Sequence, residues 1–335
     1  MNLVEDFLAN ADLSDLPPEL SAFRPTGTLL LSSRRDTSRY ATALLLDSSG
    51  TPRIVAKIVR RPHRQERLAA EFEMLQLLAG RGTIHPVAPL PLALVQHRDH
   101  WLLLETAIDG MLLDGKRFAR PPRRLWQRVD QWLVDLSSPT ATADAAWHDE
   151  QISEPLRWIE DALAATAEER SFFAATESLT HQLTSVALPV PIEHGDFFKS
   201  HIAVSRSRRL AAIDWELGRP KGLIGADAAT FLIGVFSSGG LAGEATAVAY
   251  ARHFLDAGGL ARQWLQDHLA RQGVERSWVD HILLATLARR VLNIWGPVVA
   301  DTANAPAPQF EHARALFRNF WSLRLWRMTM EHMAH

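Results

Sequence analysis

The sequence predicts an α+β protein in two parts, a small antiparallel sheet followed by a larger and mostly helical region. Residues 26–32, 40–47 and 53–59 form apolar or β-branched runs separated by turn residues, which is typical of a β-meander. Apolar residues at helical spacing follow directly and recur beyond residue 122. A chain of 335 residues is long enough for two lobes with cores of their own.

Composition indicates an ordinary globular protein and excludes several classes of function. Hydrophobic residues make up 47% and charged residues 22% of the chain, and the formal net charge is −2. Bulk charge therefore points to neither nucleic acid nor an anionic membrane as a partner. The absence of cysteine excludes disulfides and thiol catalysis. Without a signal peptide or a membrane-spanning run in the sequence, we expect a cytoplasmic protein.

The most informative stretch is residues 192–216, which predicts two short strands joined by a polar turn. Apolar residues 202–204 and 210–213 flank the turn Ser-Arg-Ser-Arg-Arg. Asp196 precedes the first strand and Asp214 follows the second. Because an antiparallel hairpin brings these ends together, the two carboxylates are expected to lie close in space.

Neighbouring carboxylates repel each other unless a cation or a proton lies between them. One interpretation is a metal site, in which Asp214 binds Mg²⁺ and Asp196 orients an attacking hydroxyl group, as phosphoryl transfer requires. The alternative is a pair of aspartates that cap turns. The Ile-Asp-Trp-Glu sequence at this spacing and a Lys-Glu pair upstream favour the metal site.

That upstream pair consists of Lys57 and Glu71. Lys57 lies inside the apolar run Ile-Val-Ala-Lys-Ile-Val, where a lysine is rarely buried without a partner. Glu71 lies on the following helix and is expected to face it, with Glu73 as the other choice. The functional interpretation is an ion pair that holds the α- and β-phosphates of ATP. The alternative is an edge-strand lysine that reaches solvent.

His-Gly-Asp at 194–196 followed by Ile-Asp-Trp-Glu at 213–216 resembles the signature of the aminoglycoside phosphotransferase family, a branch of the protein-kinase-like fold. The resemblance covers about residues 25–235. It implies a bilobal kinase-like fold, with residues 1–105 as the N-lobe that covers the nucleotide and 106–335 as the helical C-lobe that binds the acceptor. It further implies ATP or another nucleoside triphosphate, together with Mg²⁺.

The resemblance also places the nucleotide base at the link between the lobes. Adenine would bind backbone groups near Glu105 and Ala107, with Leu104 and Ala56 as apolar walls. The loop at 31–39 would cover the phosphates. It contains no glycine, so Arg34 or neighbouring hydroxyl groups would take over the phosphate contacts. An ordinary charged surface turn is the alternative.

The sequence departs from the family pattern at His201, which stands where the family has a metal-binding Asn. An imidazole nitrogen suits Mg²⁺ poorly and Mn²⁺ better. His201 would either bind the metal, hydrogen-bond Asp196, or mark the loss of one ion. We expect an active enzyme with altered metal preference. The alternative is a silent, nucleotide-binding pseudokinase subunit that partners another enzyme.

The acceptor is predicted only as a class. From residue 205 onward, 15 Lys and Arg stand against 11 Asp and Glu, which argues against a polycationic aminoglycoside. A neutral or anionic small molecule, or a Ser or Thr hydroxyl of a ribosomally made peptide, fits better. Lys199, three residues after Asp196, is a candidate for neutralising the transferring phosphoryl group, and a solvated lysine is its alternative.

Overall fold

A computed structural model of the chain describes most of its residues. The described residues are 3–10, 17, 23–31, 40–59, 65–81, 88–113, 123–137, 141–163, 165–205, 207–236, 244–302 and 307–335. They form two compact units, one of residues 1–113 with 200–218 and the other of 114–199 with 219–335. The units differ from the predicted division at residue 105 in the segments 106–113 and 200–218. None of the described helices is both long and apolar enough to cross a membrane.

A five-stranded antiparallel sheet with the order β1-β2-β3-β5-β4 is the frame of the first unit. Its strands are β1 (Gly27–Leu31), β2 (Tyr40–Leu46), β3 (Pro52–Val59), β4 (Pro91–His97) and β5 (His100–Thr106). The first three strands follow the predicted runs closely. Strand β4 was not predicted, because its proline-punctuated approach suggested an extended linker. Its proline stands at the first position of an edge strand, where a missing N–H is tolerated.

The β2–β3 turn shows how local chemistry sets the register of the sheet. Asp47 Oδ1 accepts hydrogen bonds from the backbone N–H groups of Ser49 and Thr51, at 2.8 and 3.1 Å. Gly50 takes a φ of 75°, which most other residues avoid. Arg53 Nε closes the turn with a 2.6 Å ion pair to Asp47 Oδ2. The turn thereby fixes the phase of β3, and with it the face on which Lys57 lies.

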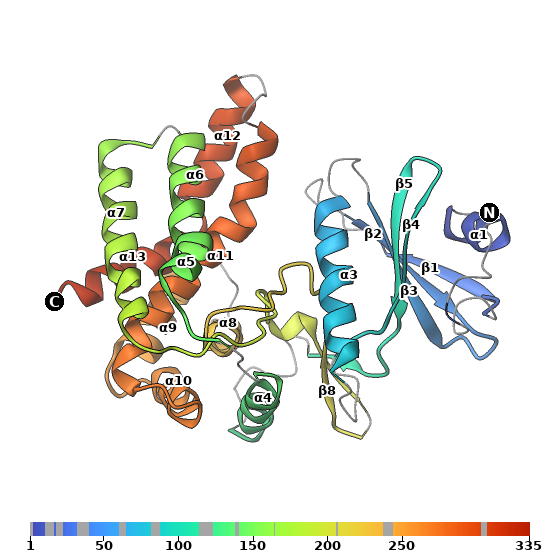
Figure 1. Cartoon of the computed structure of the whole chain (residues 1–335), viewed down its shortest axis with the longest axis horizontal. Helices are drawn as coiled ribbons and strands as arrows, with labels where there is room; N and C mark the ends of the chain where they lie inside the picture. The colour runs from blue at the N-terminus through green and yellow to red at the C-terminus, as the bar shows by residue number, and fades with distance from the viewer. Residues whose placement is uncertain are drawn as a thin grey trace. The chain divides into compact units, whose positions relative to one another are not determined.

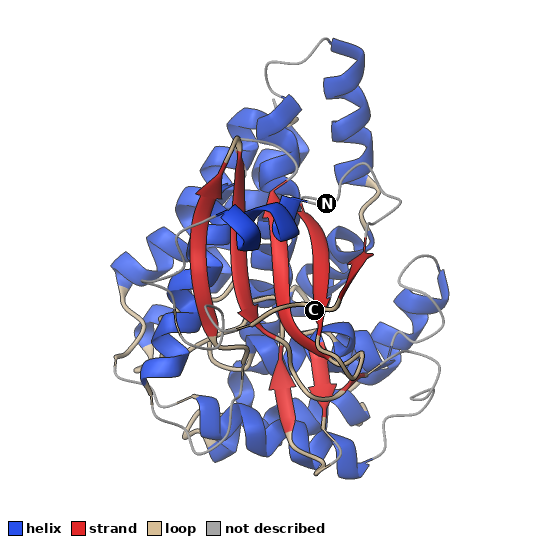
Figure 2. Cartoon of the chain, turned by 90° about the vertical axis from the view of Figure 1, so that its right-hand side faces the viewer, coloured by secondary structure: helices blue, strands red, loops and turns tan. Residues whose placement is uncertain are grey.

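Two helices cover opposite faces of this sheet. Helix α3 (Gln65–Gly80) lies against β3, β4 and β5, and helix α1 (Leu3–Asn10) lies on the other face (Figure 1). Figure 2 looks onto the sheet from the side of α1, which crosses the strands. Val4, Phe7 and Leu8 of α1 are buried in the core. Helix α1 is therefore part of the core of the first unit.

The second unit is a set of helices around the long helix α11. The described helices are α4 (Arg123–Leu136), α5 (Ala145–His148), α6 (Glu154–Ala162), α7 (Ala167–His181), α8 (Ala226–Phe236), α9 (Glu244–Tyr250), α10 (Leu260–Arg271), α11 (Val279–Thr302), α12 (Ala307–Arg318) and α13 (Trp321–Met333). Helix α11 contacts α6, α7, α8, α12 and α13, and its residues 282–288 are all buried. Residues 282–288 are all apolar except Thr286, as expected for a helix that is surrounded by others.

A charged contact fastens α7 to α12 and gives a prediction that depends on pH. Thr166 and Glu169 form a capping box at the start of α7, and Glu169 Oε1 accepts a 2.7 Å hydrogen bond from Arg318 Nε. Hydrogen bonding to Arg318, against the opposing effect of burial, lowers the pKa of Glu169 from 4.5 to about 2. The ionised form therefore stabilises the fold above pH 4.5, and this contribution is lost as the pH falls toward 2.

Glu169→Gln keeps the capping geometry and removes the charge. We expect it to lower the free energy of unfolding by about 1–2 kcal/mol at pH 7. The difference from wild type should shrink between pH 4.5 and 2, as measured by denaturant titration over this range. The exposed neighbour Glu168→Gln is the control and should change little. A deficit of Glu169→Gln that does not vary with pH would contradict the assignment.

Candidate active site

The predicted hairpin is present and brings two predicted metal ligands together. Strands β7 (Ile202–Val204) and β8 (Leu210–Ala212) pair antiparallel, and β6 (Met111–Leu112) adds a third strand to β7. The backbone N–H of Ile213 donates to the carbonyl of His201 at 2.9 Å, which extends the ladder by one step. Asp214 follows at once, and its Oδ2 lies 3.7 Å from His201 Nε2.

Lys57 is the centre of a cluster of three carboxylates in the first unit. Its Nζ lies 2.5 Å from Glu71 Oε1, 3.3 Å from Asp214 Oδ1 and 3.9 Å from Glu105 Oε1. The pairing of Lys57 with Glu71 is the predicted one, since Glu73 is exposed on the same helix. Glu71 Oε1 also accepts a 2.9 Å hydrogen bond from the backbone N–H of Trp215. One carboxylate thus fixes both the lysine and the residue that follows Asp214.

Burial and neighbouring charges have opposite effects on the pKa values of this cluster. Burial by itself would lower the pKa of Lys57, but the carboxylates of Glu105, Glu71 and Asp214 outweigh it and hold this pKa well above 10.5. Lys57 is therefore a permanent cation. Burial raises the pKa values of Glu71 and Glu105, which Lys57 opposes. One ammonium group thus faces three acidic groups, two of which burial makes harder to ionise.

Side chains alternate between the two faces of the sheet along β3 and β5, so the residues predicted to contact the nucleotide base lie on different faces. Val55 pairs with Glu105 and Lys57 pairs with Leu103 in the β3–β5 register, so these four side chains share one face. Glu105 is 2% exposed, and its Oε2 has no hydrogen-bond partner among the described residues. The sequence offered Glu105 only as a source of backbone contacts, and its side chain proves to be part of the lysine cluster.

Ala56 and Leu104 lie on the opposite face of the sheet. Both are fully buried in the core that includes α1. Val55, and not Ala56, therefore shares a face of β3 with Lys57. The backbone N–H of Ala107 donates to the carbonyl of Arg53 at 2.8 Å, which continues the sheet. A base contact from Ala56, Leu104, Glu105 or Ala107 stays a prediction. Arg34 lies outside the described residues.

The loop that carries Asp196 belongs to the second unit and is held by buried acids. Asp227, in the first turn of α8, accepts hydrogen bonds from the backbone N–H groups of His194 and Gly195, at 2.7 and 3.1 Å. Gly195 takes a φ of 79°, a conformation that favours glycine. Lys199 begins a short 3₁₀ turn and is half-buried. The approach of Asp196 to Asp214 stays a prediction.

Two neighbouring arginines of α11 contact this loop, and neither was predicted from the sequence. Arg289 Nη1 lies 2.9 Å from Glu193 Oε2, which also accepts the backbone N–H of Leu223 at 2.7 Å. Arg290 Nη1 lies 2.5 Å from Asp196 Oδ1. The only sequence signal is a charged pair inside the apolar run of a helix. Such a pair requires buried partners, but the sequence does not name them.

The possible metal ligands near the hairpin are few. Across the part of the chain that the structure describes, no group of three or more His, Asp or Glu side chains is arranged to hold a metal ion. Asp214 and His201 offer one carboxylate and one imidazole. Mg²⁺ typically uses one or two carboxylates and takes its remaining ligands from water and substrate phosphates. The pair therefore fits a metal that arrives with a nucleotide better than a resident one.

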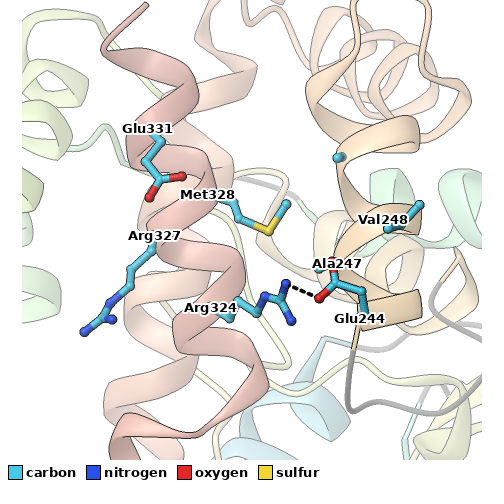
Figure 3. A pocket seen from close by; sticks show the side chains of 8 residues that line it. Glu244, Ala247, Val248, Arg324, Arg327, Met328 and Glu331 are labelled. Carbon is cyan, nitrogen blue, oxygen red and sulfur yellow. Dashed lines mark hydrogen bonds and ion pairs between the residues drawn. The ribbon is translucent and has the colours of Figure 1, made fainter.

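A separate groove of about 440 Å³ lies between α9 and α13 (Figure 3). Glu244 and Arg324 form a 2.6 Å ion pair across it, beside the exposed side chain of Val248. None of the predicted site residues lines this groove. The candidate site residues lie in two places: the lysine cluster and the end of the β7–β8 hairpin belong to the first unit, and the Asp196 loop belongs to the second.

Comparisons with known proteins show the family and the fold of the chain. The model of the phosphotransferase enzyme family matches residues 34–274. No curated protein matches the chain. The GDP complex of an aminoglycoside 2′-phosphotransferase-IIIa mutant is 13% identical, with a TM-score of 0.57, over 91% of this chain and 94% of that one.

Two solved kinases show the same fold. Choline kinase LicA from Streptococcus pneumoniae is 14% identical, with a TM-score of 0.57, over 94% of this chain and 95% of its own. Ethanolamine kinase from Plasmodium vivax is 12% identical, with a TM-score of 0.58, over 97% of this chain and 89% of its own. The protein is therefore a kinase-like phosphotransferase and belongs to the phosphotransferase enzyme family.

Proposed function

We propose that the chain transfers the γ-phosphoryl group of ATP, or of another nucleoside triphosphate, to a hydroxyl group of a small molecule. The observation that carries this proposal is the Lys57 cluster, in which one buried Glu71 oxygen binds both Lys57 Nζ and the backbone after Asp214. A fixed cation beside an acidic hairpin end is the arrangement that positions nucleotide phosphates. The GDP complex of the aminoglycoside phosphotransferase supports nucleotide use.

Each residue of the site has a role that follows from its chemistry. Lys57, fixed by Glu71, would bind phosphate oxygens, and Asp214 with His201 would hold a Mg²⁺ or Mn²⁺ ion. When bound, that ion would neutralise charge on the phosphates. Asp196 would accept a hydrogen bond from the acceptor hydroxyl and fix its direction. Catalysis of this kind depends on positioning and electrostatics.

The acceptor is proposed as a neutral or anionic molecule with a free hydroxyl group. The excess of Lys and Arg after residue 204 supports this class over a polycation. Choline kinase and ethanolamine kinase share the fold, and their named substrates are alcohols. A peptide hydroxyl would meet the same chemical requirement, and a protein partner could deliver it.

Two glutamates of α3 provide a matched test. Glu71→Gln leaves Lys57 without its ionic partner, whereas Glu73→Gln changes an exposed residue of the same helix. We expect Glu71→Gln to lower kcat/KM for ATP by about 10²-fold, because misplaced phosphates slow the transfer. Glu73→Gln should behave as wild type. Turnover is measured as ADP release with Mg²⁺ and with Mn²⁺, in the presence of a panel of alcohols, and thermal unfolding checks the fold.

The outcomes distinguish an active phosphotransferase from a silent nucleotide-binding subunit. Equal turnover in the two folded variants would reject Lys57 and Glu71 as the phosphate clamp. Wild-type protein that binds nucleotide but releases no ADP, whatever the metal and acceptor, would favour a silent nucleotide-binding subunit instead.

A further inference from the structure

Arg290 of α11 contacts the residue proposed to orient the acceptor. Its Nη1 lies 2.5 Å from Asp196 Oδ1, and the two side chains are 10% and 25% exposed. The sequence separates these residues by 94 positions, and both belong to the second unit. An arginine bound to a partly buried carboxylate restricts that carboxylate to one rotamer.

The guanidinium group is itself held from several sides. Its Cζ lies 4.2 Å from the centre of the Phe198 ring and 5.6 Å from that of Trp321 on α13. The Phe198 ring lies so close to Gly234 of α8 that a Cβ there would come within 2.8 Å of it. Arginine stacks on aromatic faces with little loss of its planar hydrogen-bonding geometry. The position of Arg290 is thus set before any substrate arrives.

Neighbouring Arg289 already links α11 to the Asp196 loop through Glu193, at 2.9 Å. Attachment of the loop to α11 therefore does not require Arg290, which favours a role at the carboxylate of Asp196.

We propose that Arg290 is a positioning residue for phosphoryl transfer, which holds Asp196 Oδ1 so that Oδ2 meets the acceptor hydroxyl. This inference rests on the proposed function. An ionised carboxylate with a fixed rotamer can hydrogen-bond the hydroxyl along one line, and such orientation is a major part of catalysis in phosphoryl transfer. Arg290 acts through Asp196 and takes no part in nucleotide binding.

The test compares Arg290→Met, Arg290→Lys and the surface variant Arg324→Gln in steady-state ADP release from ATP. We expect Arg290→Met to lower kcat by about 10–100-fold with KM for ATP within twofold of wild type. Arg290→Lys keeps the charge but not the planar group, and should recover part of kcat. Arg324→Gln removes an exposed arginine–carboxylate pair of the same unit and should match wild type.

A double variant shows whether the effect passes through Asp196. In an Asp196→Asn background, Arg290→Met should cause no further loss of kcat, because the two residues act as one unit. An additive loss would overturn the inference, and so would an unchanged kcat in folded Arg290→Met. Should Arg290→Met fail to fold, Arg290→Lys decides: wild-type kcat overturns the inference, and a reduced kcat at unchanged KM supports it. Absence of wild-type turnover would instead overturn the proposed function and this inference with it.

Discussion

Asp196→Asn is expected to lower kcat for phosphoryl transfer by about 10²–10⁴-fold, the range found for loss of a proton-accepting side chain. The amide has nearly the shape of the carboxylate, so its oxygen can still accept a hydrogen bond from Arg290. What it loses is the negative charge that would draw the acceptor hydroxyl proton. Nucleotide affinity should stay within twofold of wild type, since the proposed phosphate clamp lies on Lys57 and Glu71.

The measurement is steady-state release of ADP at saturating ATP, together with nucleotide titration and thermal unfolding of the same samples. Asp135→Asn is the matched control, because Asp135 is an exposed aspartate of the same unit. Turnover of Asp196→Asn within twofold of wild type would exclude Asp196 from the reaction. Loss of nucleotide binding together with turnover would indicate a structural role of the loop instead.

The sequence predicted those parts of the site whose residues are close together in the chain or repeat at regular spacing. The β7–β8 hairpin follows from two apolar runs around a polar turn, so His201 and Asp214 could be expected at its open end. Lys57 and Glu71 follow from a lysine inside a buried strand and from helical spacing. Local structure alone brings His201 and Asp214 together, whereas Lys57 and Glu71 meet because α3 packs on the sheet directly after β3.

The parts that the sequence did not predict depend on tertiary contacts. Arg290 meets Asp196 only because α11 lies beside the loop, and helix packing is not encoded in a local pattern. The placement of Ala56 and Leu104 depended on the phase of β3 and β5, where a shift of one residue exchanges the two faces of a sheet. Glu105 was predicted to offer only backbone contacts, because nothing in its neighbourhood shows that its side chain shares a face of the sheet with Lys57.

Asp214→Asn is expected to remove metal-dependent turnover almost completely, by about 10²-fold or more. Asp214 has a φ of 70°, in the left-handed region that few residues other than glycine adopt. Asparagine tolerates this conformation as well as aspartate does, so the hairpin end should keep its shape. The loss should therefore report on the carboxylate, which lies 3.3 Å from Lys57 Nζ and 3.7 Å from His201 Nε2.

His201→Asn distinguishes metal binding from a general effect on the cluster. It retains Asp214 and replaces an imidazole nitrogen with an amide oxygen, which suits Mg²⁺ better than nitrogen does. If His201 binds the metal, this variant should raise the ratio of Mg²⁺- to Mn²⁺-supported turnover, measured as ADP release across both metal concentrations. An unchanged ratio would remove His201 from the metal site, and turnover of Asp214→Asn near the wild-type level at saturating metal would remove Asp214 too. Because the two variants change neighbouring ligands in opposite ways, a common loss of activity cannot produce both expected results.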